Sequence, residues 1–168
     1  TNTTANRGLF IREYAAPTLY NRILTELGGS AVRVDNTSAV HLTNGVLDIR
    51  DNLWWNFATN GVAVALAETA EAAVLFSDAS RSNVVADPML RGISRTSDYG
   101  LDPRPAAGSP ALSSSRVAPI NGFYSPVSYK GAFGDINWAA DWTFLAAKGI
   151  LTSAGAGTPA PAPSIPSV

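Results

Sequence analysis

A repeat of thirty residues, lying between Pro17 and Leu66, restricts the possible folds of this chain more than any other feature of its sequence. The run Leu19–Leu24 aligns with Ile49–Trp54 without a gap, and apolar residues coincide at matching positions. The matched pairs are Leu19 with Ile49, Ile23 with Leu53, Leu24 with Trp54, Leu27 with Phe57, Val32 with Val62, and Val34 with Val64. Short apolar runs that recur at such a period are typical of solenoids, in which each turn of the chain packs on the one before.

Three short strands are predicted in the first turn of the chain, over Gly8–Arg12, Thr18–Leu24 and Ala31–Asp35. Apolar side chains alternate along them, as expected for strands with one buried face. Pro17 separates the first strand from the second, because proline cannot donate to an inner ladder. The pattern predicts an all-β fold, namely the end coils of a right-handed parallel β-helix.

The first and third strands should pair, with Leu9 and Ile11 matched to Val32 and Val34. The segment Asn36–Thr43 would then be a protruding loop that lengthens the next turn of the chain. Asn21 and Asn52 are candidates for a stacked ladder of asparagine amides, and the alternative is a pair of ordinary turn residues. Both residues lie at the entrance to an apolar strand, Asn21 before Ile23 and Asn52 before Leu53.

Beyond Leu66 the repeat stops, and the composition shifts toward turns. Ala67–Ala73 is predicted to form helical turns and Ala73–Phe76 a strand, whereas Asp78–Tyr129 should wrap back along the solenoid. A capping helix is predicted over Asn137–Gly149, with Trp138, Trp142 and Leu145 on one apolar face. We therefore predict β-helix coils over 1–77, a wrap and capping helix of the same domain over 78–151, and a Pro/Ala-rich tail or linker over 152–168.

The composition excludes several classes of function. Charged residues make up 15% of the chain and the net charge is −1, so nucleic acid is not an expected partner. No apolar run reaches the roughly 18 residues of a membrane span. The chain has no cysteine, which excludes disulfides and thiolate metal sites. The residues predict no metal site and no cofactor.

Two parts of the sequence resemble right-handed parallel β-helix repeat proteins that bacteria secrete. The first part consists of Ala16–Leu24 and Gly29–Asp35 and resembles the coils of such proteins. The second part resembles their C-terminal closing region and consists of Ala86–Leu90, Gly108–Leu112 and Tyr129–Gly134. The resemblance implies an extracellular or cell-surface setting on a bacterium. It implies no particular activity, because this fold carries lyases, hydrolases, adhesins and structural proteins.

The densest charged cluster consists of Asp48, Arg50 and Asp51. On a strand, Asp48 and Arg50 share one face, and Asp51 turns to the other unless the chain bends. Carboxylates near an arginine could serve a polysaccharide hydrolase or lyase, but this spacing favours surface charges with local salt bridges. We predict no catalytic residue and keep the cluster as a candidate binding site.

Trp54 and Trp55 form the second candidate binding site, because neighbouring strand residues point to opposite faces and one tryptophan could stack on a sugar ring. The alternative is that the wrap covers it. His41, the only histidine, is interpreted as a surface residue, since no histidine or cysteine partner is near it in the sequence.

The apolar residues Leu9, Phe10 and Ile11 form a candidate assembly edge, because the first coil begins with nothing long enough to cover it. Protein partners would stack end to end on this coil, supplied by an upstream part of a longer chain, a second copy or another subunit. Surface polysaccharide is the other candidate partner. The predicted function is a non-enzymatic domain in surface structure, adhesion or assembly. The alternatives are the C-terminal portion of a carbohydrate-active β-helix enzyme and a carbohydrate-binding module.

Overall fold

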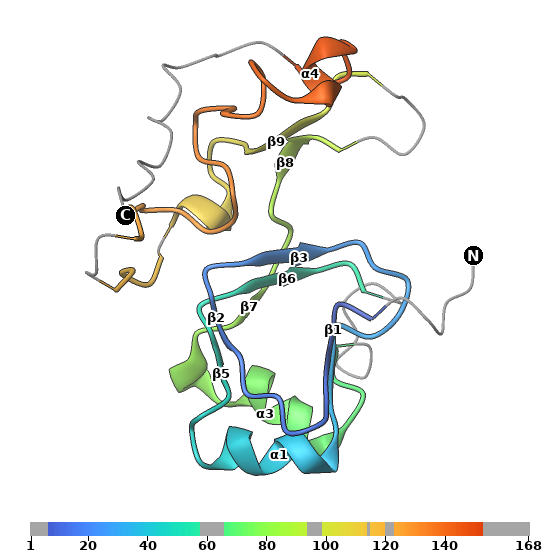
Figure 1. Ribbon diagram of the computed structural model, residues 1–168, viewed down its shortest axis with the longest axis vertical. Helices are drawn as coiled ribbons and strands as arrows, with labels where there is room; N and C mark the ends of the chain where they lie inside the picture. The colour runs from blue at the N-terminus through green and yellow to red at the C-terminus, as the bar shows by residue number, and fades with distance from the viewer. Residues whose placement is uncertain (1–6, 58–65, 94–98, 114, 120–122, 153–168) are drawn as a thin grey trace, which may run out of the picture. The chain divides into compact units, whose positions relative to one another are not determined.

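The computed structural model describes residues 7–57, 66–93, 99–113, 115–119 and 123–152 (Figure 1). Its elements are, in chain order, β1 (Leu9–Ile11), β2 (Thr18–Tyr20), β3 (Ile23–Thr25), β4 (Val32–Val34), α1 (Asn36–Thr43), β5 (Asp48–Arg50), β6 (Leu53–Trp55), α3 (Ala70–Ser77), η1 (Ala79–Arg81), β7 (Val84–Val85), β8 (Leu90–Gly92), β9 (Asp102–Pro105), η2 (Pro110–Leu112) and α4 (Phe144–Ala147). The chain divides into two compact units. The first unit consists of Thr1–Pro88 and Pro110–Gly131, and the second of Met89–Ser109 and Ala132–Val168.

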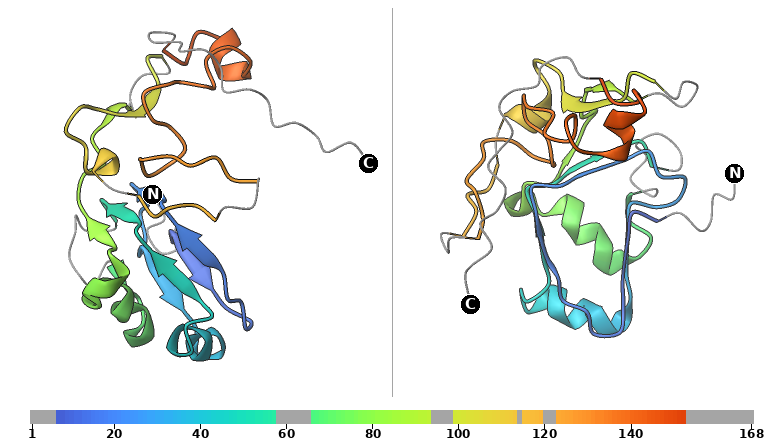
Figure 2. Two further views of the ribbon diagram at one scale, coloured as in Figure 1. Left: turned by 90° about the vertical axis from the view of Figure 1, so that its left-hand side faces the viewer. Right: turned by 45° about the horizontal axis from the view of Figure 1, so that its top comes forward.

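Parallel strand pairs organise the first unit. Strands β1, β2 and β3, here called the first strand layer, pair with β4, β5 and β6, the second strand layer (Figure 2). The thirty-residue register is confirmed, because β2 pairs with β5 and β3 with β6 at this spacing. The observed partners are Leu9 with Val32, Ile11 with Val34, Leu19 with Ile49, Ile23 with Leu53, and Leu24 with Trp54.

The predicted fold class, an all-β right-handed parallel β-helix, is wrong. The strands are short and divide among four separate sheets of two or three strands, and the described residues form no closed solenoid. Helices α1, α3 and α4 interrupt the strand order, and the sheet of β8 and β9 is antiparallel. The fold is therefore mixed α/β.

Two helices stand where the sequence predicted other structure. Asn36–Thr43, predicted as a loop, is α1, and Asp35 caps it by accepting a hydrogen bond from the backbone N–H of Ser38 at 2.9 Å. The predicted strand Ala73–Phe76 lies inside α3, which Thr69 caps through its side-chain oxygen. Side-chain oxygens at these positions satisfy N–H groups that have no partner within the helix, and thereby fix where each helix begins.

The predicted strand over Thr18–Leu24 is two strands, β2 and β3, because the chain bends at Asn21. Asn21 has a φ of 55°, and Asp51 and Ser82 at the equivalent corners have φ values of 57° and 51°. Asparagine and aspartate tolerate this left-handed conformation better than most residues. Matching corners thus turn each successive layer in the same direction.

The core of the first unit lies between the strand pairs and the helices. Val32 and Val34 are fully buried there with Ile49 and Trp54, which confirms that Val32 and Val34 face the core. Val62 and Val64 lie outside the described residues. Val32 forms a parallel bridge with Ala67 on the side away from β1.

An asparagine ladder is present, but not between the predicted residues Asn21 and Asn52. Because Asn21 is equivalent to Asp51, the partner of Asn52 is Asn83 in the following layer, and the Asn52 side chain donates to Asn83 Oδ1 at 3.2 Å. Asn83 in turn donates to the carbonyl oxygens of Ile49 and Leu75, both at 2.9 Å. The ladder ties the corner of β6 to that of β7.

The second unit is built on β8, β9 and a buried ion pair. Arg104 donates to both carboxylate oxygens of Asp102 at 2.7 Å, and its remaining Nη1 donates to the carbonyl oxygen of Asp135. A parallel bridge joins Leu101 to Leu151. These contacts connect the two separate chain segments of the unit.

The helix predicted over Asn137–Gly149 is shorter than expected. Only Phe144–Ala147 is helical, Thr143 caps its N-terminus, and Gly149 follows its end with a φ of +67°. The tail over 153–168 lies outside the described residues, and the domain boundaries predicted from the sequence stay a prediction. Among the described residues, no helix has both the length and the apolar character needed to cross a membrane.

Candidate functional site

The first strand layer has an open edge. The Leu9 N–H donates to Ala31 at 2.8 Å, and the Ile11 carbonyl accepts from Asp35 at 3.0 Å, so both residues face β4. Alternate residues of a parallel strand direct their backbone groups to opposite sides. The N–H and carbonyl of Phe10 therefore point away from β4. Among the described residues, no strand pairs with β1, β2 or β3 on that outer side.

The Phe10 side chain lies on the outer face of β1 and is 44% exposed. Three guanidinium groups surround its ring, those of Arg7, Arg12 and Arg33, at 5.4, 5.4 and 5.2 Å from the ring centroid. The negative face of an aromatic ring attracts such cations. Of the three predicted assembly residues, Phe10 is exposed, Leu9 is half-buried and Ile11 is buried.

Glu68 holds two of these arginines in place. Arg7 binds it through Nε and through Nη2, the latter at 2.7 Å, and Arg33 donates at 2.7 Å. The hydrogen bonds from Arg7 lower the pKa of Glu68 to about 2, with further contributions from Arg33 and Ser30. Glu68 therefore remains charged through the physiological range, and the cluster of three arginines and one glutamate carries a formal charge of +2.

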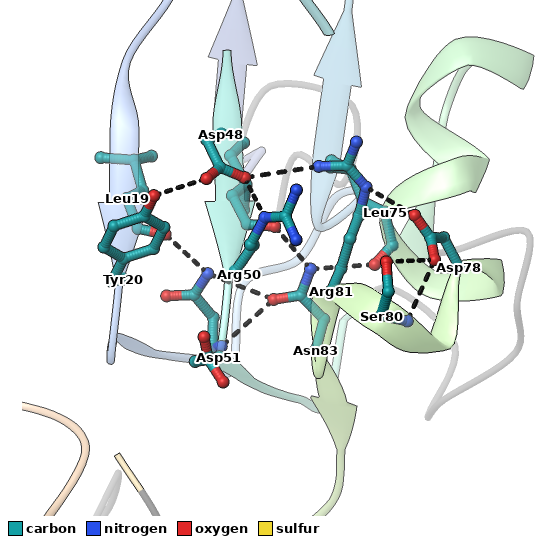
Figure 3. A network of polar contacts seen from close by, with 12 residues as sticks. Leu19, Tyr20, Asp48, Arg50, Asp51, Leu75, Asp78, Ser80, Arg81 and Asn83 are labelled. Atoms are coloured by element: carbon teal, nitrogen blue, oxygen red, sulfur yellow. Dashed lines mark hydrogen bonds and ion pairs between the residues drawn. The ribbon is translucent and has the colours of Figure 1, made fainter. Parts of the chain in front are cut away.

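The predicted charged cluster is a closed network on the outer face of β5 (Figure 3). Asp48 accepts hydrogen bonds from the Tyr20 hydroxyl and from Arg50 Nε, both at 2.5 Å, and Arg81 lies 3.6 Å away. Arg81 also forms an ion pair with Asp78 at 3.4 Å. This arrangement confirms that Asp48 and Arg50 share a strand face.

The network stabilises the charged form of Asp48. Burial opposes its ionisation, but the hydrogen bonds from Tyr20 and Arg50 outweigh that effect and hold the pKa of Asp48 below its ordinary value. The same hydrogen bond raises the pKa of Tyr20, because the phenol donates to a carboxylate. A general acid would need the opposite shift, so this geometry does not favour Asp48 in that role.

Asp51 faces a different partner, as the bend at this residue requires. Its carboxylate accepts from Arg116 Nε at 2.9 Å, and the Arg116 guanidinium lies 4.6 Å from the centroid of the Tyr20 ring. Arg116 and Asn21 also exchange two hydrogen bonds of 2.7 Å, and the Gly131 N–H donates to the Asn21 carbonyl. Arg116 and Gly131 thus contact the corner between β2 and β3.

The predicted tryptophan site divides between the core and the surface. Trp54 is fully buried and lies edge-on to Phe76 at 5.3 Å, while Trp55 is half-buried. Trp54 therefore has no face available to a ligand.

His41, predicted as a surface residue, lies in α1, and its ring approaches that of Tyr14 edge-on at 6.5 Å.

Three residues that sequence reasoning missed complete these clusters: Glu68, Arg81 and Arg116. Each lies more than thirty residues from at least one partner in sequence, so no local motif marked it. Within the described residues, no group of three or more His, Cys, Asp or Glu side chains is placed to hold a metal ion.

Comparisons with protein-family models, with curated proteins and with solved structures found no match to this chain. The resemblance to secreted bacterial proteins therefore stays a prediction.

Proposed function

We propose that this protein is a non-enzymatic assembly domain whose first strand layer adds the strands of a second copy. The observation that carries the proposal is the shared open edge of β1, β2 and β3. Each is the last strand of its sheet on the same side of the unit, and each directs alternate backbone donors and acceptors outward. Unpaired edges of this kind readily accept strands of another chain.

The chain itself shows that one layer of this shape accepts another. The second layer pairs with the first along all three strands, in parallel register, at spacings of 23 and 30 residues. An identical chain presents strands with the same lengths and the same separation. This match favours a second copy over an unrelated partner.

The charged clusters support a binding role rather than catalysis. Asp48 and Asp51 are both engaged by arginine side chains. The predicted alternative, a carbohydrate-active enzyme, would need a carboxyl group that exchanges protons near neutral pH. The exported, cell-surface setting belongs to the proposal as well, and it rests only on the sequence resemblance.

The proposal is tested by removing one outward donor without breaking the existing ladder. Phe10→Pro deletes the outward N–H of β1, whereas Phe10→Ala keeps it and removes the same side chain. Thr18→Pro does the same on β2: the preceding Pro17 carbonyl accepts from the Asp48 N–H of β5, so the N–H of Thr18 points to the other side. The mass of each protein in solution is measured by light scattering over a range of concentrations.

We expect the mass of the unaltered chain and of Phe10→Ala to rise with concentration, and that of both proline variants to stay at one chain. Circular dichroism must show that the proline variants are folded. A monomer at every concentration for the unaltered chain would overturn the proposal, as would undiminished association of the folded proline variants.

A further inference from the structure

Three aromatic rings form a continuous stack in the second unit. The Phe133 and Trp138 rings are nearly parallel, at 6°, with centroids 5.0 Å apart. Trp142 continues the stack, with its ring 5.9 Å from Trp138 and inclined by 20°. Trp138 thus makes a stacked contact with each of these two rings.

Both indole rings are held in fixed orientations. Trp138 Nε1 donates to the Ala132 carbonyl at 2.8 Å, and Trp142 Nε1 donates to the Trp138 carbonyl at 2.9 Å. The turn between them is closed by Thr143, whose hydroxyl donates to the Ala139 carbonyl at 2.7 Å. A ring that is already oriented loses little conformational entropy when a ligand binds, which favours affinity.

The outer end of the stack is open. Trp142 is 70% exposed although the Trp138 ring lies against one of its faces, so most of the Trp142 ring remains accessible to a ligand. Its only hydrogen-bonding group is engaged by the chain. What Trp142 offers to a ligand is therefore a flat π-surface, not a hydrogen bond.

We infer that this face of Trp142 binds a neutral pyranose ring of a carbohydrate. The negative face of an indole attracts the weakly positive C–H groups on one side of a sugar ring. Asp141 precedes Trp142 and is exposed. Lys148 lies over the ring of the exposed Phe144 at 5.5 Å. The Asp141 carboxylate, next to Trp142 in the chain, can accept hydrogen bonds from sugar hydroxyl groups.

The charge of the unit selects this ligand over a nucleic-acid base, which would stack equally well. The described part of the second unit holds as many acidic as basic side chains, namely Asp102, Asp135, Asp141, Arg91, Arg104 and Lys148. Arg104 is occupied by Asp102, and Arg91 lies 3.5 Å from Asp135. Without an excess of positive charge, phosphate groups have little to bind.

The test is nuclear magnetic resonance of the four tryptophan indole N–H groups during titration with two neutral hexasaccharides, one of β-1,4-linked glucose and one of β-1,4-linked xylose. Trp142→Ala removes the open face and Trp142→Phe keeps a smaller one. Phe123→Ala is the matched control, because Phe123 is 83% exposed but meets Tyr124 edge-on rather than in a parallel stack.

We expect the Trp142 and Trp138 signals to shift with at least one hexasaccharide. Affinity should fall about ten-fold or more in Trp142→Ala, less in Trp142→Phe, and not in Phe123→Ala. The inference would be overturned if neither sugar shifted these signals, or if Phe123→Ala lost as much affinity as Trp142→Ala. It would also be overturned if the signals shifted with protein concentration or with added oligothymidylate instead of with sugar. The outcome does not depend on self-association through β1, so the two proposals can fail separately.

Discussion

The side chain of Asn52 donates a hydrogen bond to Oδ1 of Asn83 at 3.2 Å, and the backbone N–H of Asn52 donates to the same oxygen at 3.1 Å. Asn83 also serves two carbonyl groups, those of Ile49 and Leu75. One amide thus satisfies groups from a strand, a helix and a neighbouring corner. Asn52 is fully buried, so no water is expected to replace the missing partner if Asn83 is removed.

Replacing Asn83 by alanine should destabilise the first unit strongly. Each buried polar group left without a partner costs roughly 1–3 kcal/mol, and several lose theirs here. Asn44→Ala, at an exposed position after α1, is the control and should change the free energy of unfolding much less. Urea denaturation of both variants is the measurement. Equal, small effects would show that the ladder contributes little.

Glu68→Gln should remove a pH-dependent part of the stability. The pKa of Glu68 is about 2 in the folded chain and its ordinary value is 4.5. A lowered pKa contributes stability that is complete above 4.5 and is lost as the pH falls toward 2. Melting temperatures measured across this interval should therefore fall more steeply for the unaltered chain than for Glu68→Gln. The control Glu71→Gln, at an exposed position of α3, should follow the unaltered chain.

Two tryptophan substitutions should differ sharply in their effects. Trp54 is fully buried in the core, and Trp54→Ala should cost about 3–5 kcal/mol. Trp142 is 70% exposed, so Trp142→Ala should cost about 1 kcal/mol, mainly through its contact with Trp138. Trp142, predicted from the sequence to lie on the apolar face of a capping helix, is thus exposed instead of packed against the rest of the chain. Unfolding by denaturant, monitored by circular dichroism, measures the stability loss of each variant.

Asp48→Asn should shift the titration of Tyr20. The Asp48 carboxylate raises the pKa of Tyr20 because it accepts a hydrogen bond from the Tyr20 hydroxyl. Removal of the carboxylate should therefore lower the pKa of Tyr20 toward its ordinary value. One of the five tyrosines should then ionise at lower pH, seen as an earlier rise of tyrosinate absorbance. Asp78→Asn changes a nearby carboxylate that does not bind Tyr20, and it should leave the titration unchanged.

We expect no hydrolase or lyase activity from this chain on neutral or acidic polysaccharides. Asp48 and Asp51 are paired with Arg50 and Arg116, and the pKa of Asp48 is lowered rather than raised. Reducing-end and unsaturated-sugar assays measure the two reactions. Turnover that disappears in Asp48→Asn or Asp51→Asn would contradict this expectation.

The strand register was predictable because apolar residues recur thirty residues apart in the sequence. Leu19 pairs with Ile49 and Ile23 with Leu53, as the repeat required. The fold class was not predictable in this way. Helix α1 consists largely of residues with modest helix propensity, and it depends on the cap at Asp35 and the burial of Leu42. Tertiary packing decided its conformation.

The charged site was predictable only where its partners are close in sequence. Asp48 and Arg50 are two residues apart on one strand face and form the expected ion pair. Arg116 reaches Asp51 across 65 residues, and Glu68 reaches Arg7 across 61. Such contacts are made by the fold and leave no local pattern. The stack of Trp138 and Trp142 was visible as an i, i+4 spacing, but it suggested a buried helix face.

The chain passes between its two compact units three times, at 88–89, 109–110 and 131–132. Neither unit is a continuous stretch of sequence, so no single cut of the chain separates them intact. A fragment that ends at Pro88 would lose Arg116 and Gly131, which hold the corner at Asn21. A stop codon after Pro88 would therefore leave the first unit without its second chain segment.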